Sequence, residues 1–361
     1  MRSTARCRPA VGNLPNALAN KTLAPPFVKA ISPFRLLFGD GGSKINCGLR
    51  GVRVRENFGV SVDAAVLYEW RTETMTTKFA VLSMDIEDWR HLDYFIKSDC
   101  DASYTMLDGL DRYLELIAEM GVPSSFFCVG ELAETVKPKL REIHAAGGDI
   151  GSHTQSHRRP LTLTLEETRE ELRVSKDILE QAFGGGVEGF RAPCFSFNKD
   201  RLALLPELGY RYDSSRILFD SHPLYGTLEM DGFEQLSNNI FRCGDFFEFQ
   251  TSTKRVFGKD LPISGGGYLR IFPWMLTRSL LNRYLPKNEL YTLYIHPFEL
   301  SPQKSPPFPP GTSLKTKIRF SLGRKSAAKK LRKLVDLLRK AGFQFTTFSN
   351  LRTGILNDTK Q

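Results

Sequence analysis

Two histidines spaced four residues apart, His153 and His157, are the side chains in this sequence that point most directly to metal chemistry. If they lie on one helical turn, both imidazoles face the same side and can bind one zinc ion. A carboxylate from another strand end would complete three protein ligands and leave a fourth position for water, as in a catalytic site. An isolated histidine pair with this spacing more often has a structural role. Other residues must therefore show whether this pair binds a metal.

Further polar residues follow other short apolar runs. The sequence Asp85-Ile86-Glu87-Asp88 follows the first run, while Arg191 and His296 follow later ones. The carboxyl ends of parallel strands meet on one face of an α/β fold. These side chains can therefore come together although they are far apart in the chain.

The segments that must position these residues alternate between strand-like and helix-like patterns. Short apolar runs predict strands, apolar residues at helical spacing predict helices, and a Thr164–Glu167 capping box opens the longest helix. This alternation predicts a parallel sheet or barrel, with a looser pattern over residues 216–290. The predicted strands are residues 79–84, 125–129, 149–152, 189–192, 291–295 and 343–347, and the predicted helices are residues 107–120, 140–146, 164–183, 199–208 and 326–341.

The composition is that of a folded chain without a membrane span. The 361 residues are 41% hydrophobic and 25% charged, and they contain no uninterrupted apolar run of about 18 residues. The net charge is +10, but residues 1–55 carry ten Lys or Arg against one acid, Asp40. The remaining chain is close to neutral, so we expect no nucleic-acid partner. The six cysteines form no close pairs, which favours a reducing, cytoplasmic location.

The sequence divides into two parts near Met75. Residues 1–74 lack sustained periodicity, which indicates little packed structure. They are a targeting peptide, a disordered tail, or translation from upstream of a true start at Met75, and we prefer the last interpretation. No compact apolar run follows the basic start, so a secretory signal is disfavoured. Residues 75–361 are expected to form the functional domain.

Five motifs follow one another along this second part. They are Met84-Asp85-Ile86-Glu87-Asp88-Trp89, Gly151-Ser152-His153 through His157, Arg191-Ala192-Pro193-Cys194-Phe195, Tyr212-Asp213-Ser214-Ser215 and Leu293-Tyr294-Ile295-His296-Pro297. In this order they resemble the motifs of the polysaccharide deacetylases of the NodB-homology type, and the resemblance spans residues 79–351. The D-x-E-D-W type of the first motif and the Gly-rich segment 264–268 look most similar to the exopolysaccharide-associated branch.

The resemblance implies a distorted (β/α) barrel with fewer than eight parallel strands and a zinc-dependent hydrolysis of an amide. Asp85 matches the family's catalytic base, and Arg191 matches the residue that keeps this base ionised and oriented. His296 matches the general acid that protonates the departing sugar amine. Zinc, or another divalent cation, would polarise the carbonyl group and activate a water molecule.

The metal carboxylate departs from the family pattern. Two adjacent aspartates are usual there, whereas Ile86 follows Asp85 in this sequence. Side chains two apart on an extended strand point the same way, so Glu87 can join Asp85 on one face and reach the metal. We therefore favour Glu87 as the ligand beside His153 and His157, and Asp88 remains the alternative.

Four further residues are candidates for substrate binding. Asp213 and Ser214 match a motif that shapes the substrate groove, although the same residues are typical of a turn. Tyr268 could offer an aromatic face to a sugar ring, and His222 could belong to a loop over the site.

The expected function is hydrolysis of an N-acetyl group on a hexosamine within a glycan or a lipid-linked glycan precursor. One alternative is an allantoinase-like amidohydrolase that opens small cyclic amides, because that class is similar in fold. A non-catalytic, glycan-binding barrel is the other alternative, and it is disfavoured because base, acid and ligands occur together. The expected partner is an N-acetylated glycan, and the sequence leaves the oligomeric state open.

Overall fold

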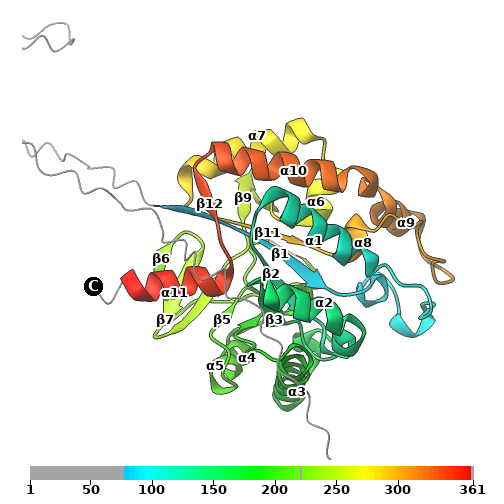
Figure 1. Cartoon of the computed structure of the whole chain (residues 1–361), viewed down its shortest axis with the longest axis horizontal. Helices are drawn as coiled ribbons and strands as arrows, with labels where there is room; N and C mark the ends of the chain where they lie inside the picture. The colour runs from blue at the N-terminus through cyan, green and yellow to red at the C-terminus, as the bar shows by residue number, and fades with distance from the viewer. Residues whose placement is uncertain (1–76, 220–221, 359–361) are drawn as a thin grey trace, which may run out of the picture. The chain divides into compact units, whose positions relative to one another are not determined.

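A mostly parallel β-sheet with helices packed along it forms the part of the chain described by a computed structural model, residues 77–219 and 222–358 (Figure 1). The segment predicted to be unpacked, residues 1–74, lies outside these described residues. The strands are β1 (Lys78–Ile86), β2 (Ser124–Cys128), β3 (Asp149–Ser152), β4 (Gly189–Phe190), β5 (Tyr212–Asp213), β6 (Glu234–Ser237), β7 (Ile240–Cys243), β8 (Phe246–Phe249), β9 (Thr253–Val256), β10 (Lys259–Pro262), β11 (Leu290–Ile295) and β12 (Phe343–Phe345).

The helices alternate with the parallel strands and cover them. They are α1 (Asp108–Met120), α2 (Ala133–Ala145), α3 (Leu165–Phe183), α4 (Lys199–Leu202), α5 (Leu204–Glu207), α6 (Gly266–Ile271), α7 (Trp274–Tyr284), α8 (Pro297–Leu300), α9 (Leu314–Ser321), α10 (Arg324–Lys340) and α11 (Phe348–Asp358). Thr164 caps α3 through the predicted capping box with Glu167. None of the helices in the described ranges is long and apolar enough to cross a bilayer.

Seven neighbouring strands pair in parallel, in the order β11-β1-β2-β3-β4-β5-β8. β7 and β6 extend the sheet in antiparallel orientation, and β12 pairs in parallel with the first residues of β1. An isolated parallel bridge between Gly265 and Tyr294 returns the chain to β11. The architecture is therefore the predicted α/β class, and it fits a distorted (β/α) barrel.

Alternation along β1 separates two packing environments. Ala80, Leu82 and Met84 belong to the large core that includes the apolar faces of α1 and α10. Val81 packs on the other side of the strand, in a cluster that includes Phe348 at the start of α11. The odd-numbered side chains of β1 therefore face the interior of the curved sheet.

Several sequence expectations need correction. The helix predicted at residues 140–146 is α2, which spans Ala133–Ala145. The predicted helix 199–208 is split into α4 and α5, because Pro206 has no N–H to donate to the Leu202 carbonyl oxygen. The loose region 216–290 contains β6 to β10, α6 and α7. Five of these elements are strands of four residues, which are too short to give a clear alternating pattern.

Candidate active site

The carboxyl end of β1 brings two carboxylates into one cavity. After Asp85 the chain turns tightly, and the Glu87 N–H donates to the Asp85 carbonyl oxygen at 3.0 Å. Asp85 and Glu87 are only 3% and 2% exposed, yet both line a cavity of about 800 Å3. The two carboxylates therefore line the same cavity, and a tight turn rather than a continuing extended strand places Glu87 there.

Glu87 meets the two histidines of the second motif. The ligating atoms of Glu87, His153 and His157 all lie within 4.8 Å of one another, and the three side chains are buried. His157 Nε2 contacts Glu87 directly, while His153 Nε2 lies 3.8 Å from a Glu87 oxygen. Burial alone raises the pKa of Glu87, but the charges of His157 and His296 hold it well below its ordinary value. Two imidazoles and a carboxylate fit a divalent cation, so these residues could hold the metal.

The histidine pair does not lie on a helical turn, so this part of the sequence analysis was wrong. Thr154 and His157 have positive φ angles of 63° and 60° in an irregular loop that follows β3. Such angles are strained for residues with a Cβ atom. The loop nevertheless brings both imidazoles to Glu87, and local strain of this kind is typical of functional sites.

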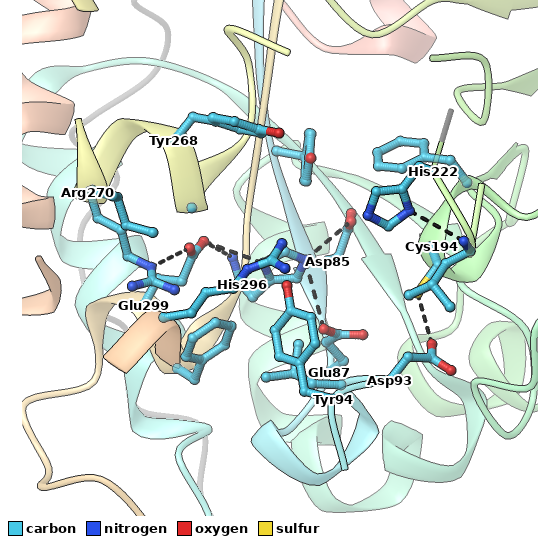
Figure 2. A pocket seen from close by; sticks show the side chains of 18 of the residues that line it. Asp85, Glu87, Asp93, Tyr94, Cys194, His222, Tyr268, Arg270, His296 and Glu299 are labelled. Carbon is cyan, nitrogen blue, oxygen red and sulfur yellow. Dashed lines mark hydrogen bonds and ion pairs between the residues drawn. The ribbon is translucent and has the colours of Figure 1, made fainter. Parts of the chain in front are cut away.

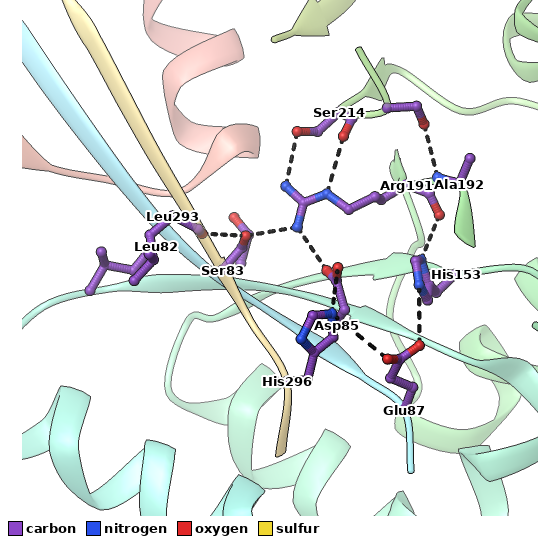
Figure 3. Close-up of polar contacts among 12 residues, drawn as sticks. Leu82, Ser83, Asp85, Glu87, His153, Arg191, Ala192, Ser214, Leu293 and His296 are labelled. Atoms are coloured by element: carbon purple, nitrogen blue, oxygen red, sulfur yellow. Dashed lines mark hydrogen bonds and ion pairs between the residues drawn. The ribbon is translucent and has the colours of Figure 1, made fainter. Parts of the chain in front are cut away.

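The His153 ring is held in the form that a metal ion requires. His153 Nδ1 lies 2.7 Å from the Arg191 carbonyl oxygen (Figure 3). Because a carbonyl oxygen only accepts, Nδ1 carries the proton and Nε2 presents its lone pair on the side of Glu87. Burial lowers the pKa of His153 to about 4, so the ring is neutral at pH 7.

Asp88, the alternative ligand, has a structural role here. Its Oδ1 accepts hydrogen bonds from the backbone N–H groups of Trp89 at 2.8 Å and Met106 at 2.9 Å. The Asp88 N–H in turn donates to Nδ1 of His91 at 2.9 Å. Asp88 thus caps the short helical turn Trp89–His91, and the geometry favours Glu87 as the ligand.

Arg191 fixes the position of the Asp85 carboxylate. Its Nη1 donates to Asp85 Oδ1 at 2.7 Å and to Ser83 Oγ at 2.8 Å (Figure 3). Its Nε and Nη2 donate to the carbonyl and hydroxyl oxygens of Ser214 at 3.1 and 2.9 Å. The guanidinium is 1% exposed and stacks over the Phe127 ring at 4.2 Å. It is therefore a fixed support for the carboxylate.

His296 lies close to both carboxylates. Its Nε2 is 3.9 Å from Asp85 Oδ2 and 3.7 Å from Glu87 Oε1. Its Nδ1 lies 3.3 Å from a Glu299 oxygen. Burial alone lowers the pKa of His296, but Glu87 and Glu299 raise it to about 9. His296 can therefore carry a proton at neutral pH.

The partners of His296 were not assigned roles by the sequence analysis. Glu299 is buried, and it also accepts from Arg270 Nε at 2.9 Å (Figure 2). Gly266 permits this contact, because a Cβ atom there would lie 1.9 Å from Glu299 Oε2. The spacing of three between His296 and Glu299 was a signal for this pair, whereas nothing in the sequence linked it to Arg270.

The four predicted substrate-binding residues separate into two groups. Asp213 and Ser214 are fully buried and do not line the cavity. Ser214 supports Arg191, and Asp213 accepts from the Ser215 hydroxyl group at 2.6 Å. Both residues therefore lie behind the cavity wall, where they support other residues of the site and cannot contact a ligand directly.

Tyr268 and His222 do line the cavity, on opposite sides in Figure 2. His222 stacks on Tyr225, with ring centroids 3.8 Å apart. Burial lowers the pKa of His222, and the charge of Arg319 adds to this effect. Both residues are placed where a ligand could touch them, and their roles stay predictions.

Two family descriptions match consecutive stretches of the chain. Residues 101–212 match "Polysaccharide deacetylase", and residues 214–352 match a "Domain of unknown function" (DUF3473). His153, His157 and Arg191 lie in the first stretch, and His296 lies in the second. Asp85 and Glu87 precede both.

Curated relatives support the first match. A peptidoglycan deacetylase of Helicobacter pylori is 29% identical over 117 residues, which are 32% of this chain and 40% of that protein. The peptidoglycan deacetylase-like protein FGM2 of Gibberella zeae is 26% identical over 119 residues, or 32% of this chain and 35% of that protein. The chain thus aligns with less than half the length of each of these relatives.

A solved structure extends the likeness to the fold. A proposed polysaccharide deacetylase from Mycobacterium smegmatis has a TM-score of 0.50 and 18% sequence identity, and the match covers 78% of this chain and 92% of that one. At this identity the likeness shows the fold alone, and that fold agrees with the distorted barrel. The family match and the curated relatives thus support the polysaccharide deacetylase family for residues 101–212, and the fold agrees with this assignment.

Proposed function

We propose that this protein is a metal-dependent deacetylase that removes N-acetyl groups from hexosamine units of a glycan and releases acetate. One observation carries the proposal: Asp85 and His296 both border the Glu87, His153 and His157 cluster in the same cavity. Proton acceptor, proton donor and ligand set thus converge where one acetamide group could bind.

The chain's own residues divide the proton transfers of amide hydrolysis between them. Arg191 orients Asp85, which accepts a proton from the attacking water as its oxygen bonds to the acetyl carbon. His296 donates a proton to the sugar nitrogen as the carbon–nitrogen bond breaks, so acetate and an amine are released. A divalent ion held by Glu87, His153 and His157 would polarise the acetyl carbonyl group and lower the pKa of a bound water.

The choice of a glycan rests on resemblance. The curated relatives named above are peptidoglycan deacetylases or similar proteins. The D-x-E-D-W type of the motif at Asp85 resembles the exopolysaccharide-associated branch, which leads us to propose an exopolysaccharide or its precursor as substrate. We propose zinc as the ion, because two imidazoles and one carboxylate are typical of catalytic zinc.

Acetate release from N-acetylated oligosaccharides tests this function. Wild-type protein should release acetate, a chelator should stop the release, and added zinc should restore it. The Asp85→Asn variant should be at least about a hundredfold slower, with the same metal content as wild type. Turnover of allantoin without acetate release would favour the cyclic amidohydrolase, and glycan binding without any turnover would favour the non-catalytic barrel.

A further inference from the structure

The wall of the cavity formed by α9 differs in chemistry from the rest of the site. Leu314, Ile318 and Leu322 follow one another at spacings of four, so they form one stripe along α9 and its C-terminal cap. All three line the same cavity as Asp85 and His296. They are 72%, 52% and 50% exposed, which is unusual for large aliphatic side chains on a single face.

The helix is anchored in a way that leaves this stripe uncovered. Phe320, on another face of α9, is fully buried and stacks on Phe298 with ring centroids 4.8 Å apart. Phe298 directly follows the His296-Pro297 sequence of the candidate active site. The stripe is therefore held beside the site by its own helix, and no described residue buries it.

Positive charge accompanies the stripe. Lys315 and Arg319 also line the cavity, and neither forms an ion pair with a carboxylate in the described ranges. The Arg319 guanidinium lies 4.6 Å from the centre of the Tyr94 ring. Burial raises the pKa of Tyr268, and the charge of Arg319 opposes this rise.

A neutral glycan alone does not suit this wall. Sugar hydroxyl groups would lose water against leucine and isoleucine without gaining hydrogen bonds. Unpaired Arg and Lys side chains are complementary to a phosphate, and an aliphatic stripe is complementary to a hydrocarbon chain. The three stripe residues extend roughly 12 Å along the helix, which is enough to contact a short length of such a chain.

We propose that the substrate is a lipid-linked glycosyl phosphate, whose N-acetyl group reaches Asp85 and His296 while its phosphate meets Arg319 and Lys315 and its hydrocarbon chain lies on Leu314, Ile318 and Leu322. This inference rests on the proposed deacetylase function and specifies its substrate class. The aliphatic stripe and the two cations of α9 line the same cavity as Asp85 and His296. One molecule can therefore contact all of them at once, so we propose a single ligand that carries sugar, phosphate and hydrocarbon chain.

Kinetic comparison of three probes tests the inference on the full chain. The probes are the decyl phosphodiester of N-acetylglucosamine 1-phosphate, N-acetylglucosamine 1-phosphate itself and a water-soluble N-acetylglucosamine oligomer. We expect the decyl phosphodiester to have at least about tenfold higher kcat/KM for acetate release than the other two. Ile318→Ser and Arg319→Gln should each lower kcat/KM for the decyl phosphodiester much more than kcat/KM for the oligomer, and so remove most of this advantage.

Two matched variants control for general effects. Met275→Ser changes an aliphatic side chain on α7 that is 84% exposed and does not line the cavity. Lys317→Gln changes a cation on α9 that does not line the cavity either. Both should behave as wild type on all three probes. Equal turnover of all probes, or equal losses in the α9 and control variants, would overturn the proposal.

Binding separates this inference from the proposed function. The decyl phosphodiester should bind Asp85→Asn protein, and adding Arg319→Gln should weaken this binding by about tenfold. If no probe is deacetylated but this binding pattern holds, the deacetylase function is wrong and the ligand class stands. If anionic phospholipid vesicles bind the protein and the decyl phosphodiester does not, the stripe contacts a membrane and the substrate proposal is wrong.

Discussion

Asp85 is proposed to accept a proton and His296 to donate one, and the residues that support them carry opposite charges. Arg191 donates to Asp85, whereas Glu299 accepts from His296. Asp85 Oδ2 and His296 Nε2 lie 3.9 Å apart, next to the cluster that contains Glu87. Their supporting residues therefore decide which group accepts a proton and which donates one.

Replacing the proposed base should separate catalysis from metal binding. Asp85→Asn keeps the shape of the side chain and its contact with Arg191, but it removes the proton acceptor. We expect kcat to fall by about a hundredfold to ten-thousandfold, with metal content unchanged. Elemental analysis and acetate release measure both quantities. Near wild-type turnover would assign the base role to another residue.

The carboxylates after Asp85 should differ in what they contribute. Glu87→Gln removes a charged ligand from the cluster with His153 and His157, so the purified protein should lose most of its metal. Asp88→Asn should keep the metal and lower the melting temperature, because the amide is a weaker acceptor for the N–H groups of Trp89 and Met106. The opposite pattern of metal loss would make Asp88 the ligand.

The pH dependence of turnover should report on Glu299. Its negative charge helps raise the pKa of His296 to about 9, so His296 keeps its proton well above neutral pH. Glu299→Gln removes this charge, which lowers the pKa of His296 and moves the alkaline fall in activity to lower pH by roughly one to two units. Profiles of kcat/KM between about pH 5 and pH 10 measure the shift.

A matched control makes this result specific. Glu115→Gln changes an exposed carboxylate on α1 and should leave the pH profile unchanged. An alkaline limb that does not move in Glu299→Gln would show that His296 does not donate the proton. Unchanged metal content would confirm that the shift does not reflect a damaged metal cluster.

At the scale of elements, the sequence predicted those strands and helix ends that depend on a local residue pattern. The strand that carries Asp85 and the strand that precedes His296 are apolar runs, and α3 begins with a capping box. The meeting of strand ends followed from the parallel fold. The loop geometry at His153 and His157 depends on two left-handed residues, which no periodicity reveals. The buried Arg270–Glu299 pair depends on tertiary contacts between distant segments.

The pairing of β5 with β8 buries two carboxyl groups against each other. Asp213 and Glu248 are directly opposite, and both are fully buried. One oxygen of each accepts a hydrogen bond, from Ser215 and from the Arg216 N–H, and the other finds no donor among the described residues. Burial raises the pKa of Asp213 to about 6 and holds that of Glu248 well above its ordinary value. The pair therefore keeps a proton in the folded state.

This shared proton predicts how stability changes with pH. Unfolded carboxyl groups lose their protons near pH 4, so between there and at least pH 6 the folded state binds more protons than the unfolded state. The free energy of unfolding should therefore decrease as pH rises through this window. Glu248→Gln supplies an amide donor to Asp213, and it should raise the melting temperature at about pH 8 by several degrees. A lower melting temperature than wild type would contradict the shared proton.

At the scale of the whole molecule, the site is assembled from both matched stretches and from the strand before them. Glu87 comes from the end of β1, His153 from the loop after β3, and His296 from the end of β11. β1 lies between β11 and β2, so it joins the two stretches in one sheet. The four cysteines in the described ranges are unpaired. The reducing, cytoplasmic location stays a prediction.

The dependence of this assembly on residues 1–74 is testable. Every side chain assigned to the site, and every strand that pairs with β1, lies within residues 78–345. The positive charge of residues 1–55 also lies apart from the site in the sequence. A chain that begins at Met75 should therefore have the same melting temperature, metal content and turnover as the full chain. Calorimetry, elemental analysis and acetate release measure these. A fall of several degrees in melting temperature, or a loss of turnover, would show that residues 1–74 contribute to the folded domain, and the interpretation of Met75 as the true start would then be wrong.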